Sequence, residues 1–173
     1  MVRLTSDRLD DRLRGDLRAL LWSSFDHFSE DDWEHTLGGV HVLAMEGRRV
    51  IGHAAVVPRR VYLGDEQIAA GYVEGVAVAA AERSSGVGSA VMREVADIIG
   101  DAELIGALST SAHAFYRRLG WERWRGPSFV MEEGRRRRTA EEDDGIMVLP
   151  RPARGPVDLE SAIAVDARSG DDW

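Results

Sequence analysis

The spacing of apolar residues along the chain predicts helices and strands in alternation. Leucines at positions 13, 17, 20 and 21 recur at helical intervals, so residues 10–25 are expected to form an amphipathic helix. Ser29 with the acidic residues after it is typical of a helix N-cap, and it predicts a second, short helix that extends to about residue 37. Two glycines at 38 and 39 end that helix.

The following segments are short and apolar, and turn residues separate them. They predict strands at 40–46 and 50–60, joined by a turn at 47–49. A turn at 63–65 leads into a third strand, residues 68–78. Glu74 and Gly75 interrupt the apolar pattern of that strand, as a β-bulge would.

The second half of the chain continues the alternation. A helix is expected at 86–99, with valines at 87, 91 and 95 on one face, followed by a strand at 104–108 and a helix at 113–119 that Gly120 ends. Further strands are expected at 124–132 and 146–149. This order predicts a mixed α/β (α+β) fold with a mixed, largely antiparallel sheet that is splayed at a bulge and flanked by helices.

Composition narrows the class of protein. The 173 residues suffice for a single domain, 44% are hydrophobic and 30% are charged, which is typical of a soluble globular protein. The chain has no apolar run of membrane-spanning length, no secretory leader and no cysteine. We therefore expect a cytoplasmic location and no membrane partner.

Charge argues against a nucleic-acid partner. With 22 basic and 30 acidic residues the net charge is −8, which repels nucleic acid and attracts cationic ligands. Four arginines at 135–138 are followed by acidic residues at 141–144, so their fields cancel. We expect this segment to be a solvated loop. The histidines have no metal-ligand spacing, and no metal site is predicted.

One loop carries a specific chemical signal. Arg83, Gly86 and Gly88 form an Arg-x-x-Gly-x-Gly sequence between a predicted strand and a predicted helix. Unpaired N–H groups at the helix start, the positive end of the helix dipole and the arginine would together bind a phosphate or pyrophosphate. The alternative is a tight strand-to-helix turn without a ligand. The third glycine of the dinucleotide fingerprint and the Gly-Lys-Ser/Thr of a P-loop are both missing.

The same loop resembles the acetyl-coenzyme A loop of the GNAT superfamily of N-acetyltransferases. The words Asp32-Trp-Glu-His-Thr-Leu-Gly-Gly39, Gly71-Tyr-Val-Glu-Gly-Val-Ala-Val78, Gly106-Ala-Leu-Ser109 and Gly170-Asp-Asp-Trp173 narrow the resemblance to the aminoglycoside 2'-N-acetyltransferases. The resemblance covers nearly the whole chain. It implies one GNAT domain, residues 1–173, whose segment 135–173 completes the substrate pocket, and acetyl transfer from acetyl-CoA by direct attack in a ternary complex.

By this resemblance the cosubstrate, acetyl-CoA, has two binding segments. The strand residues Val76, Ala77 and Val78 would pair with the pantetheine arm. The pyrophosphate would be bound by the loop residues Arg83, Ser84, Ser85, Gly86, Val87, Gly88 and Ser89.

The resemblance also implies two catalytic residues. Glu74 would act as a base through water, and Tyr116 as the acid that protonates the leaving thiolate. From the residues alone, Glu74 could equally be a solvent-facing strand residue, and Tyr116 a core aromatic with a satisfied hydroxyl. The reaction needs no covalent enzyme intermediate, which suits a chain without cysteine.

Acidic residues are expected to bind the cationic aminoglycoside. The resemblance assigns substrate contacts to Asp32, Glu74, Gly75, Ser109, Asp143, Asp144, Asp171 and Trp173, the last through its α-carboxylate. A solvated, disordered end is the alternative for the tail. Many family members carry an acid where this chain has His27; Asp26 is adjacent, but its side chain would point elsewhere.

Two other functions fit the same residues. One is a GNAT enzyme for another amine, such as an amino sugar or a polyamine; the other is a protein that binds cationic drugs without chemistry. Members of the family are often homodimers, so a homodimer is a further expectation.

Overall fold

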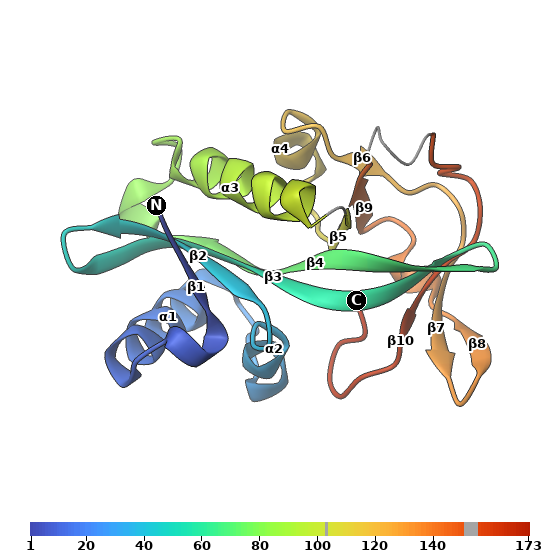
Figure 1. Ribbon diagram of the computed structural model, residues 1–173, viewed down its shortest axis with the longest axis horizontal. Coiled ribbons are helices and arrows are strands. Elements are labelled where there is room, and N and C mark those ends of the chain that lie inside the picture. Colours follow the sequence, from blue (N-terminus) through green and yellow to red (C-terminus); the bar gives the residue numbers. More distant parts are fainter. Residues whose placement is uncertain (103, 151–155) are drawn as a thin grey trace. The chain divides into compact units, whose positions relative to one another are not determined.

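The computed structural model describes residues 1–102, 104–150 and 156–173. They form two compact parts. The first part comprises Met1–Val57 and Val73–Ile98, and the second part comprises Pro58–Tyr72 and Ile99–Trp173. Two long strands, β3 (Arg49–Leu63) and β4 (Glu66–Val78), contribute residues to both parts (Figure 1).

The helices of the first part begin where the sequence predicts. In α1 (Asp11–Ser24) the N-cap carboxylate of Asp10 accepts the Leu13 N–H at 2.7 Å. In α2 (Glu30–His35) Ser29 and Asp32 form a capping box, in which each side chain bonds the other residue's backbone N–H. The third helix, α3 (Val87–Asp101), begins in this part and follows the short 3₁₀ turn η2 (Ala80–Glu82).

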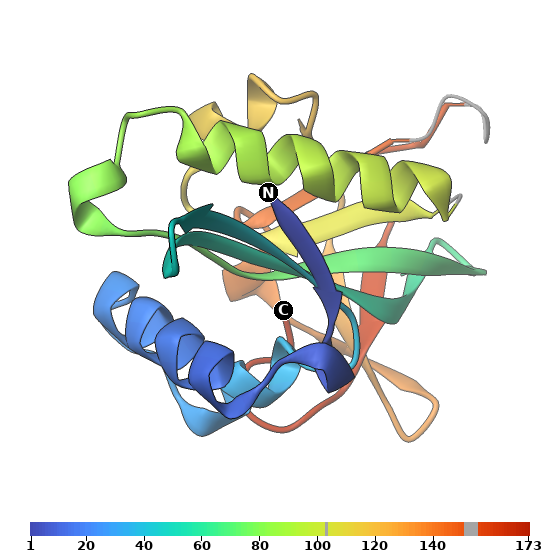
Figure 2. The ribbon, with the colours of Figure 1, turned by 60° about the vertical axis from the view of Figure 1, so that its left-hand side comes forward.

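The sheet of the first part has β1 (Val2–Thr5) beside β2 (Val40–Glu46), and β2 beside the start of β3. Both pairings are antiparallel. Strand β1, with the 3₁₀ turn η1 (Ser6–Arg8) after it, was not predicted. Figure 2 shows α3 over one face of these strands and α1 with α2 over the other, so both faces are covered.

A β-bulge sets the register of the β2–β3 hairpin. Ala44 pairs with Gly52 but Met45 pairs with Val50, so Ile51 is the extra residue on β3. Beyond the bulge His41 lies opposite Ala55, and Leu43 opposite His53. Because opposite residues share a face and alternate residues return to it, His41 and His53 lie on the same face.

The core of the first part lies between α1, α2 and the strands. It contains Leu17, Leu21, Trp33, Leu43 and Ala77, all with little or no exposed surface. On the other face Gly52 permits the close approach of α3. A Cβ atom there would lie 2.7 Å from Val87 Cγ1 and 3.4 Å from Val91 Cγ2, so a larger residue would push the helix side chains aside.

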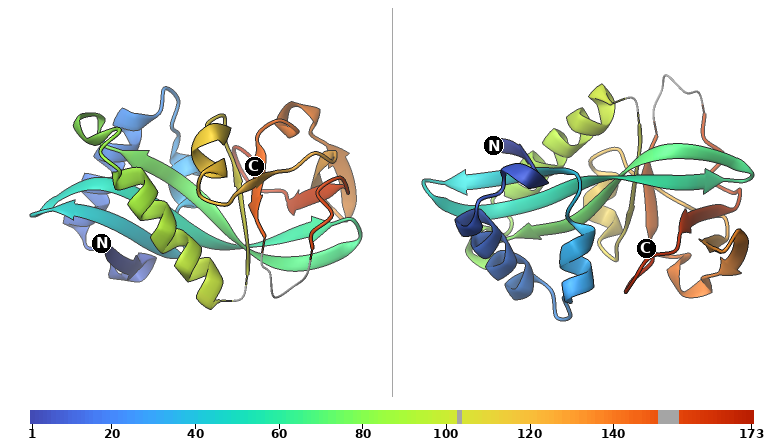
Figure 3. Two further views of the ribbon diagram at one scale, coloured as in Figure 1. Left: turned by 90° about the horizontal axis from the view of Figure 1, so that it is seen from above. Right: turned by 60° about the horizontal axis from the view of Figure 1, so that its bottom comes forward.

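The second part has eight strand segments in the order β6-β9-β5-β4-β3-β10-β7-β8. Its own strands and helix are β5 (Ile105–Ser109), α4 (His113–Arg117), β6 (Glu122–Arg123), β7 (Ser128–Glu132), β8 (Arg135–Arg138), β9 (Ile146–Leu149) and β10 (Ile163–Asp166), with the 3₁₀ turn η3 (Ala140–Glu142). The β4–β5 and β10–β7 pairs are parallel, and the β5–β9 and β7–β8 pairs are antiparallel. Figure 3 shows β7, β8 and β10 beside one another in the orange and red part of the chain.

Three expectations for the second half of the chain are wrong in detail. The strand expected at 124–132 begins only at Ser128, as β7, and the two-residue strand β6 lies before the expected range. Between them Trp124 is buried and its Nε1–H donates to the Ser161 carbonyl at 2.9 Å. The arginines at 135–138 form strand β8 and not a solvated loop; Arg137 and Arg138 bond to Asp172 and Asp143. Strand β10 was not predicted, and part of the Pro-rich stretch before it, residues 151–155, lies outside the described residues.

The prediction of a mixed α/β fold with a mixed sheet is confirmed. Buried apolar residues of the second part form one cluster that includes Tyr72, Trp124, Ile146 and Trp173. Within the described residues, no helix is both long enough and apolar enough to span a membrane.

Candidate functional site

The predicted site residues occur in both parts of the structure. In the first part the loop of residues 83–86 joins η2 to α3. Ser84 and Gly86 have positive φ angles of 66° and 92°, which give the tight turn, and a Cβ at Gly86 would meet nothing within 4 Å. The first N–H that bonds back into α3 is that of Ala90, which donates to the Gly86 carbonyl at 3.0 Å. The preceding N–H groups, of Val87 to Ser89, have no acceptor within the helix.

Arg83 adds a positive charge to this loop. Its side chain is exposed, and among the described residues no carboxylate lies within 4.0 Å of it. The neighbouring acid, Glu82, is instead paired with Arg49 at 3.2 Å. An exposed guanidinium beside a helix N-terminus can bind a phosphate group, so the loop has the features of an anion site.

The end of β4 approaches this loop. Glu74, Gly75, Val76 and Val78 are half-buried, and Ala77 is buried in the core of the first part. Gly75 has φ +57°, so the irregularity predicted at this position is confirmed as a backbone kink. A Cβ at Gly75 would lie 2.9 Å from Thr36 Cγ2, so neither the conformation nor the space suits a larger residue.

Asp32, which the resemblance assigns to the substrate, has a structural role here. Its carboxylate accepts the Ser29 N–H at 2.7 Å and the Ser29 hydroxyl at 2.8 Å. One oxygen, Oδ2, makes both bonds, so the other oxygen remains for a further contact. Asp26 and His27, at the position where this chain departs from the family pattern, are both exposed.

Four predicted substrate residues line one pocket in the second part. This pocket, of about 360 Å³, is lined by Ser109, Thr110, Ser111, His113, Asp144, Gly145, Asp171 and Trp173. The residues come from the end of β5, the start of α4, the turn before β9 and the C-terminus. The structure therefore brings together Ser109, Asp144, Asp171 and Trp173, which are far apart in sequence.

The C-terminal residues are ordered by hydrogen bonds. Trp173 is 5% exposed; its Nε1–H donates to Thr139 Oγ1 at 3.2 Å and its backbone N–H to Asp171 Oδ1 at 3.2 Å. Asp172 accepts the Arg168 N–H at 3.0 Å and bonds the Arg137 side chain at 2.7 Å. The terminal residue is thus fixed beside the pocket, and a disordered tail is excluded.

The acidic run at 141–144 divides into different environments. Asp143 accepts hydrogen bonds from the Ser128 backbone and hydroxyl and from Arg138, whose guanidinium lowers the pKa of Asp143 to about 2. Asp144 lines the pocket and pairs with Arg123, and 89% of its side chain is exposed. Of the two aspartates, only Asp144 faces the space in which a ligand could bind.

Glu142, which the sequence did not single out, lies next to this pocket. Its carboxylate accepts the Ser109 hydroxyl at 3.4 Å. Partial burial and the nearby charge of Asp171 raise the pKa of Glu142. Nothing in the run Glu141 to Asp144 distinguishes the residue that turns toward Ser109, because η3 rotates successive side chains by about 120°.

Tyr116 lies on α4 and is 6% exposed. Its ring packs edge-on against Phe115 and Trp121, with ring centroids 5.0 and 6.0 Å away. Burial raises the pKa of Tyr116 to about 12. The phenol therefore keeps its proton at neutral pH and can act only as a proton donor or a hydrogen-bonding group there.

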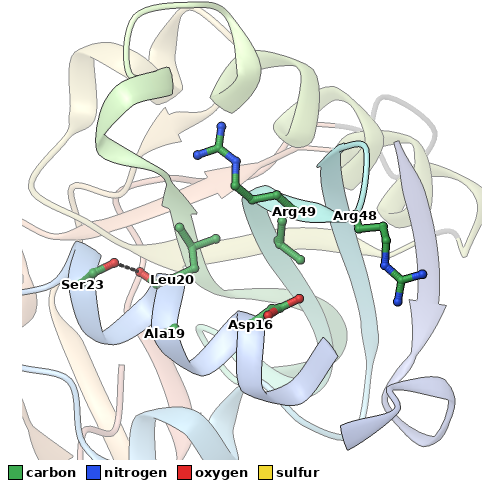
Figure 4. A pocket seen from close by; sticks show the side chains of 7 residues that line it. Asp16, Ala19, Leu20, Ser23, Arg48 and Arg49 are labelled. Atoms are coloured by element: carbon green, nitrogen blue, oxygen red, sulfur yellow. Dashed lines mark hydrogen bonds between the residues drawn. The ribbon is translucent and has the colours of Figure 1, made fainter. Parts of the chain in front are cut away.

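A larger pocket, of about 510 Å³, lies between α1 and the turn from β2 to β3 (Figure 4). Asp16, Leu20 and Ser23 face it from the helix, and Arg48 and Arg49 from the turn. It contains none of the predicted site residues, and its mixed lining indicates no particular ligand.

Two buried histidines connect to the kink in β4. His41 Nδ1 lies 3.0 Å from His53 Nε2, and His53 Nδ1 lies 2.7 Å from the Gly75 carbonyl oxygen. Burial, with the nearby charge of Arg14, lowers the pKa of His41 to about 4. Burial and the neighbouring His41 lower the pKa of His53 to about 3. Both imidazoles are therefore neutral at pH 7. No pattern in the sequence predicts that these two histidines are in contact.

This pair predicts how stability depends on pH. Between about pH 6.5 and pH 4 the histidines are protonated in the unfolded chain but not in the folded one, so unfolding takes up as many as two protons. The free energy of unfolding should then fall by up to about 2.7 kcal/mol for each unit by which the pH is lowered. Above pH 7 the pair should not make the free energy of unfolding depend on pH. Urea denaturation at pH 7.5, 6.0 and 5.0 measures this slope.

The variant His27→Asn removes an exposed histidine and should keep the slope, whereas a double change of His41 and His53 to asparagine should remove it. Equal stability of the unchanged protein at pH 7.5 and 5.0 would show that the pair is charged in the folded state. Asp143 does not interfere, because its lowered pKa affects stability only below about pH 4.

Comparison with known proteins identifies the family to which this chain belongs. The family model described as acetyltransferase (GNAT) domain matches residues 10–124. An aminoglycoside 2'-N-acetyltransferase of Mycolicibacterium fortuitum is 41% identical over 174 residues, covering 98% of this chain and 89% of the relative. The chain belongs to the aminoglycoside 2'-N-acetyltransferase family of GNAT acetyltransferases. The resemblance inferred from its residues is therefore confirmed.

Solved structures agree with this family in fold. A GNAT family N-acetyltransferase from Escherichia coli, in complex with CoA, is similar with a TM-score of 0.64 at 17% identity. The alignment covers 95% of this chain and 88% of the E. coli chain. A GNAT family acetyltransferase from Brucella melitensis, in complex with acetyl-CoA, has a TM-score of 0.63 at 17% identity and covers 94% of each chain. At these identities the likeness establishes the GNAT fold alone.

Proposed function

We propose that this GNAT acetyltransferase transfers the acetyl group of acetyl-CoA to the 2'-amino group of aminoglycosides. The observation that carries the proposal is the 41% identity, over 98% of the chain, to an aminoglycoside 2'-N-acetyltransferase. The pocket lined by Asp144, Asp171 and Trp173 supports it independently, because an aminoglycoside carries several ammonium groups and acidic groups attract them.

The residues of the first part fit acetyl-CoA. The N–H groups of Val87, Gly88 and Ser89 and the Arg83 guanidinium would bind the pyrophosphate, and the open space at Gly86 leaves room for it. The backbone of Val76, Ala77 and Val78 would hold the pantetheine arm, and Ser84 and Ser85 would complete the loop. When bound, acetyl-CoA supplies an activated thioester carbonyl.

The proposed reaction balances without a covalent intermediate. The neutral amine nitrogen attacks the thioester carbonyl carbon, a C–N bond forms, and the C–S bond breaks. Before the attack, Glu74 accepts a proton from the substrate ammonium group through water. The neutral Tyr116 hydroxyl donates a proton to the sulfur, and the proton that the nitrogen loses as the amide forms returns to the Tyr116 oxygen. The products are the N-acetylated aminoglycoside and the free thiol of CoA.

Substrate binding is proposed to depend mainly on Asp144, Asp171, Ser109 and the Trp173 carboxylate, with the Gly75 backbone beside the reacting amine. Asp32 and Asp143 also belong to the proposed set, yet both carboxylates already accept hydrogen bonds from protein groups. Their replacement should therefore affect stability as well as substrate affinity. Segment 135–173 is proposed to contribute to this pocket within one catalytic domain.

Replacing Arg83 tests the acetyl-CoA loop. Arg83→Ala should raise the KM for acetyl-CoA about tenfold or more, the value expected for losing a hydrogen bond to a charged group, and leave kcat nearly unchanged. Steady-state kinetics at saturating aminoglycoside measure this. Arg93, which is exposed on the helix α3 that follows the loop, provides the control when it is changed to alanine. A KM for acetyl-CoA that is equal in the two variants would remove Arg83 from the binding site.

Release of free thiol from acetyl-CoA distinguishes the proposal from its two alternatives. Thiol release with aminoglycosides, and little with spermidine or glucosamine, is the expected result. Faster release with the small amines would indicate a GNAT enzyme for another substrate. Stoichiometric aminoglycoside binding by calorimetry, without thiol release, would indicate a protein that only sequesters the drug.

The cellular context completes the proposal. A cytoplasmic location suits an enzyme that uses acetyl-CoA, and expression in a susceptible bacterium should then raise the tobramycin concentration needed to stop growth. We also propose a homodimer, by analogy with the family. Light scattering during size-exclusion chromatography would test it, and a mass near the 19.1 kDa of one chain would contradict it.

A further inference from the structure

A continuous chain of hydrogen bonds crosses the first part and ends at the kink in β4. The Gly38 N–H donates to Ser6 Oγ at 3.0 Å, and Ser6 Oγ lies 2.9 Å from His41 Nε2. His41 Nδ1 lies 3.0 Å from His53 Nε2, and His53 Nδ1 lies 2.7 Å from the Gly75 oxygen. Both histidine residues have no exposed surface. The function proposed above makes no use of these side chains.

The direction of every bond in this chain follows from its last member. A carbonyl oxygen can only accept, so His53 Nδ1 carries a proton and donates it to Gly75. His53 is neutral, so its Nε2 is an acceptor, and His41 must donate from Nδ1. His41 Nε2 is then an acceptor, and the Ser6 hydroxyl donates to it at 2.9 Å in preference to the Gly39 carbonyl oxygen, which lies 3.2 Å away. Both imidazoles thus carry their proton on Nδ1.

The hydrogen bond from His53 also fixes the orientation of the Gly75–Val76 peptide. A peptide unit is planar and trans, so its N–H points away from its carbonyl oxygen. The His53 donor binds the Gly75 oxygen and thereby fixes the direction of the Val76 N–H on the opposite side. A hydrogen bond to a carbonyl also polarises its amide group, which makes the N–H a stronger donor.

We infer that His53 is a positioning residue, aligned by His41 and Ser6, which fixes the Gly75–Val76 peptide so that the Val76 N–H binds the acetyl carbonyl oxygen. The inference rests on the proposed function, in which the Gly75 backbone lies beside the reacting amine and the Val76 backbone beside the pantetheine arm that carries the acetyl group. Negative charge develops on that oxygen as the amine attacks. A donor whose direction is fixed in advance stabilises this charge without reorganising during the reaction.

Packing at the kink explains why a hydrogen bond is needed there. Gly75 adopts φ +57°, which interrupts the regular extended backbone of β4. The heavy atoms nearest to a Cβ built on Gly75 would be Thr36 Cγ2, Leu21 Cδ2 and His53 Cε1. The first two are apolar carbons, and His53 supplies the donor. Without this donor, the partly buried carbonyl would lose a hydrogen bond that water cannot fully replace.

The tautomers can be observed directly in the unchanged protein. Long-range ¹H–¹⁵N correlation spectra of ¹⁵N-labelled protein distinguish a protonated ring nitrogen from an unprotonated one. We expect both His41 and His53 to carry the proton on Nδ1 from pH 6 to pH 8, with resonances assigned by single changes to asparagine. A proton on Nε2 of His53 would overturn the inference, because Nδ1 of the neutral ring could then not donate to the Gly75 carbonyl.

A matched pair of variants tests the effect on catalysis. In His53→Asn the amide nitrogen replaces Nδ1 and can still donate to Gly75; His53→Leu has a similar shape without a donor, and both lose Nε2 equally. We expect kcat of the leucine variant to be at least about tenfold below that of the asparagine variant. This is in the direction of the larger decrease in kcat that follows complete removal of an oxyanion-hole donor. The KM values of the two variants for acetyl-CoA should agree within about twofold.

Equal kcat values in the two variants, with thermal unfolding showing both to be folded, would overturn the positioning role and leave His53 a core residue. If either variant does not fold, the tautomers of the unchanged protein decide. Failure of the proposed function has a different signature: the unchanged protein would then release no thiol with any aminoglycoside.

Discussion

Replacing Glu74 by glutamine should lower kcat for aminoglycoside acetylation by about 10²- to 10⁴-fold, the usual contribution of a general base. Glutamine preserves the size and hydrogen-bonding reach of the side chain but cannot accept the amine proton. The ammonium form of the substrate, which cannot attack a carbonyl, would then have to lose its proton to solvent. The KM for acetyl-CoA should change little, because the loop at residues 83–89 is unaltered.

The matched control lies on the same strand. Glu66→Gln removes the same charge from an exposed position of β4 and should leave kcat within about twofold, as expected for a surface change. Because Glu74 acts on the proton of the amine, the defect of Glu74→Gln should shrink at high pH, where more substrate is already neutral. A variant at Glu74 as active as the one at Glu66 would show that the base lies elsewhere.

Replacing Asp171 by asparagine should weaken aminoglycoside binding. Asp171 lines the pocket and its Oδ1 accepts the Trp173 N–H, a bond that asparagine can also accept, so the terminal residue should stay in place. The KM for tobramycin should rise about 10- to 100-fold, the equivalent of the ~1.5–3 kcal/mol of a hydrogen bond to a charged group. The pKa of Glu142, which the charge of Asp171 raises, should fall toward its ordinary value.

The control must separate a local contact from the general negative field. Asp65→Asn removes one charge from a fully exposed side chain of the second part. It should change the KM for tobramycin by less than about twofold at physiological ionic strength, because salt screens distant surface charges. A similar rise in both variants would mean that only the net charge attracts the drug. An unchanged KM in Asp171→Asn would remove the C-terminal segment from the binding site.

Local signals predicted the first half of the fold well. The leucine spacing of α1, the Ser29 cap and the glycine turn before α3 act through neighbours in sequence, and the structure has all three. β8 was missed because its stability comes from distant partners. Its arginines pair with β7, and Arg138 bonds to Asp143 and Ser128. Four adjacent arginines carry no period that distinguishes a strand from a loop.

The substrate residues show the same limit. The resemblance selected Asp143 and Asp144 together, yet in the turn that follows η3 Asp143 bonds to Arg138 and Asp144 lines the pocket. Glu142, the last residue of η3, lies beside Ser109. The acids at 141–144 cannot be ranked from sequence, because rotation about a single turn decides which of them meets a ligand.

The histidine pair could not be predicted for a related reason. A regular hairpin in which Glu46 opposes Arg49 would place His41 opposite Ala54, and His53 would face the other side of the sheet. The bulge between Ala44 and Met45 shifts the register by one residue and brings both imidazoles to one face. No residue in the turn indicates that shift, so the sequence showed two unconnected histidines.

Acetyl transfer to a 2'-amine is tested most directly by comparing two aminoglycosides that differ at that position. Tobramycin carries a 2'-amine and kanamycin A a 2'-hydroxyl, and thiol release from acetyl-CoA reports turnover of either. We expect turnover with tobramycin and none above background with kanamycin A, although both drugs offer other amines. Equal turnover with both would place the acetylated amine elsewhere, and turnover with neither, despite binding of acetyl-CoA, would contradict the assigned substrate.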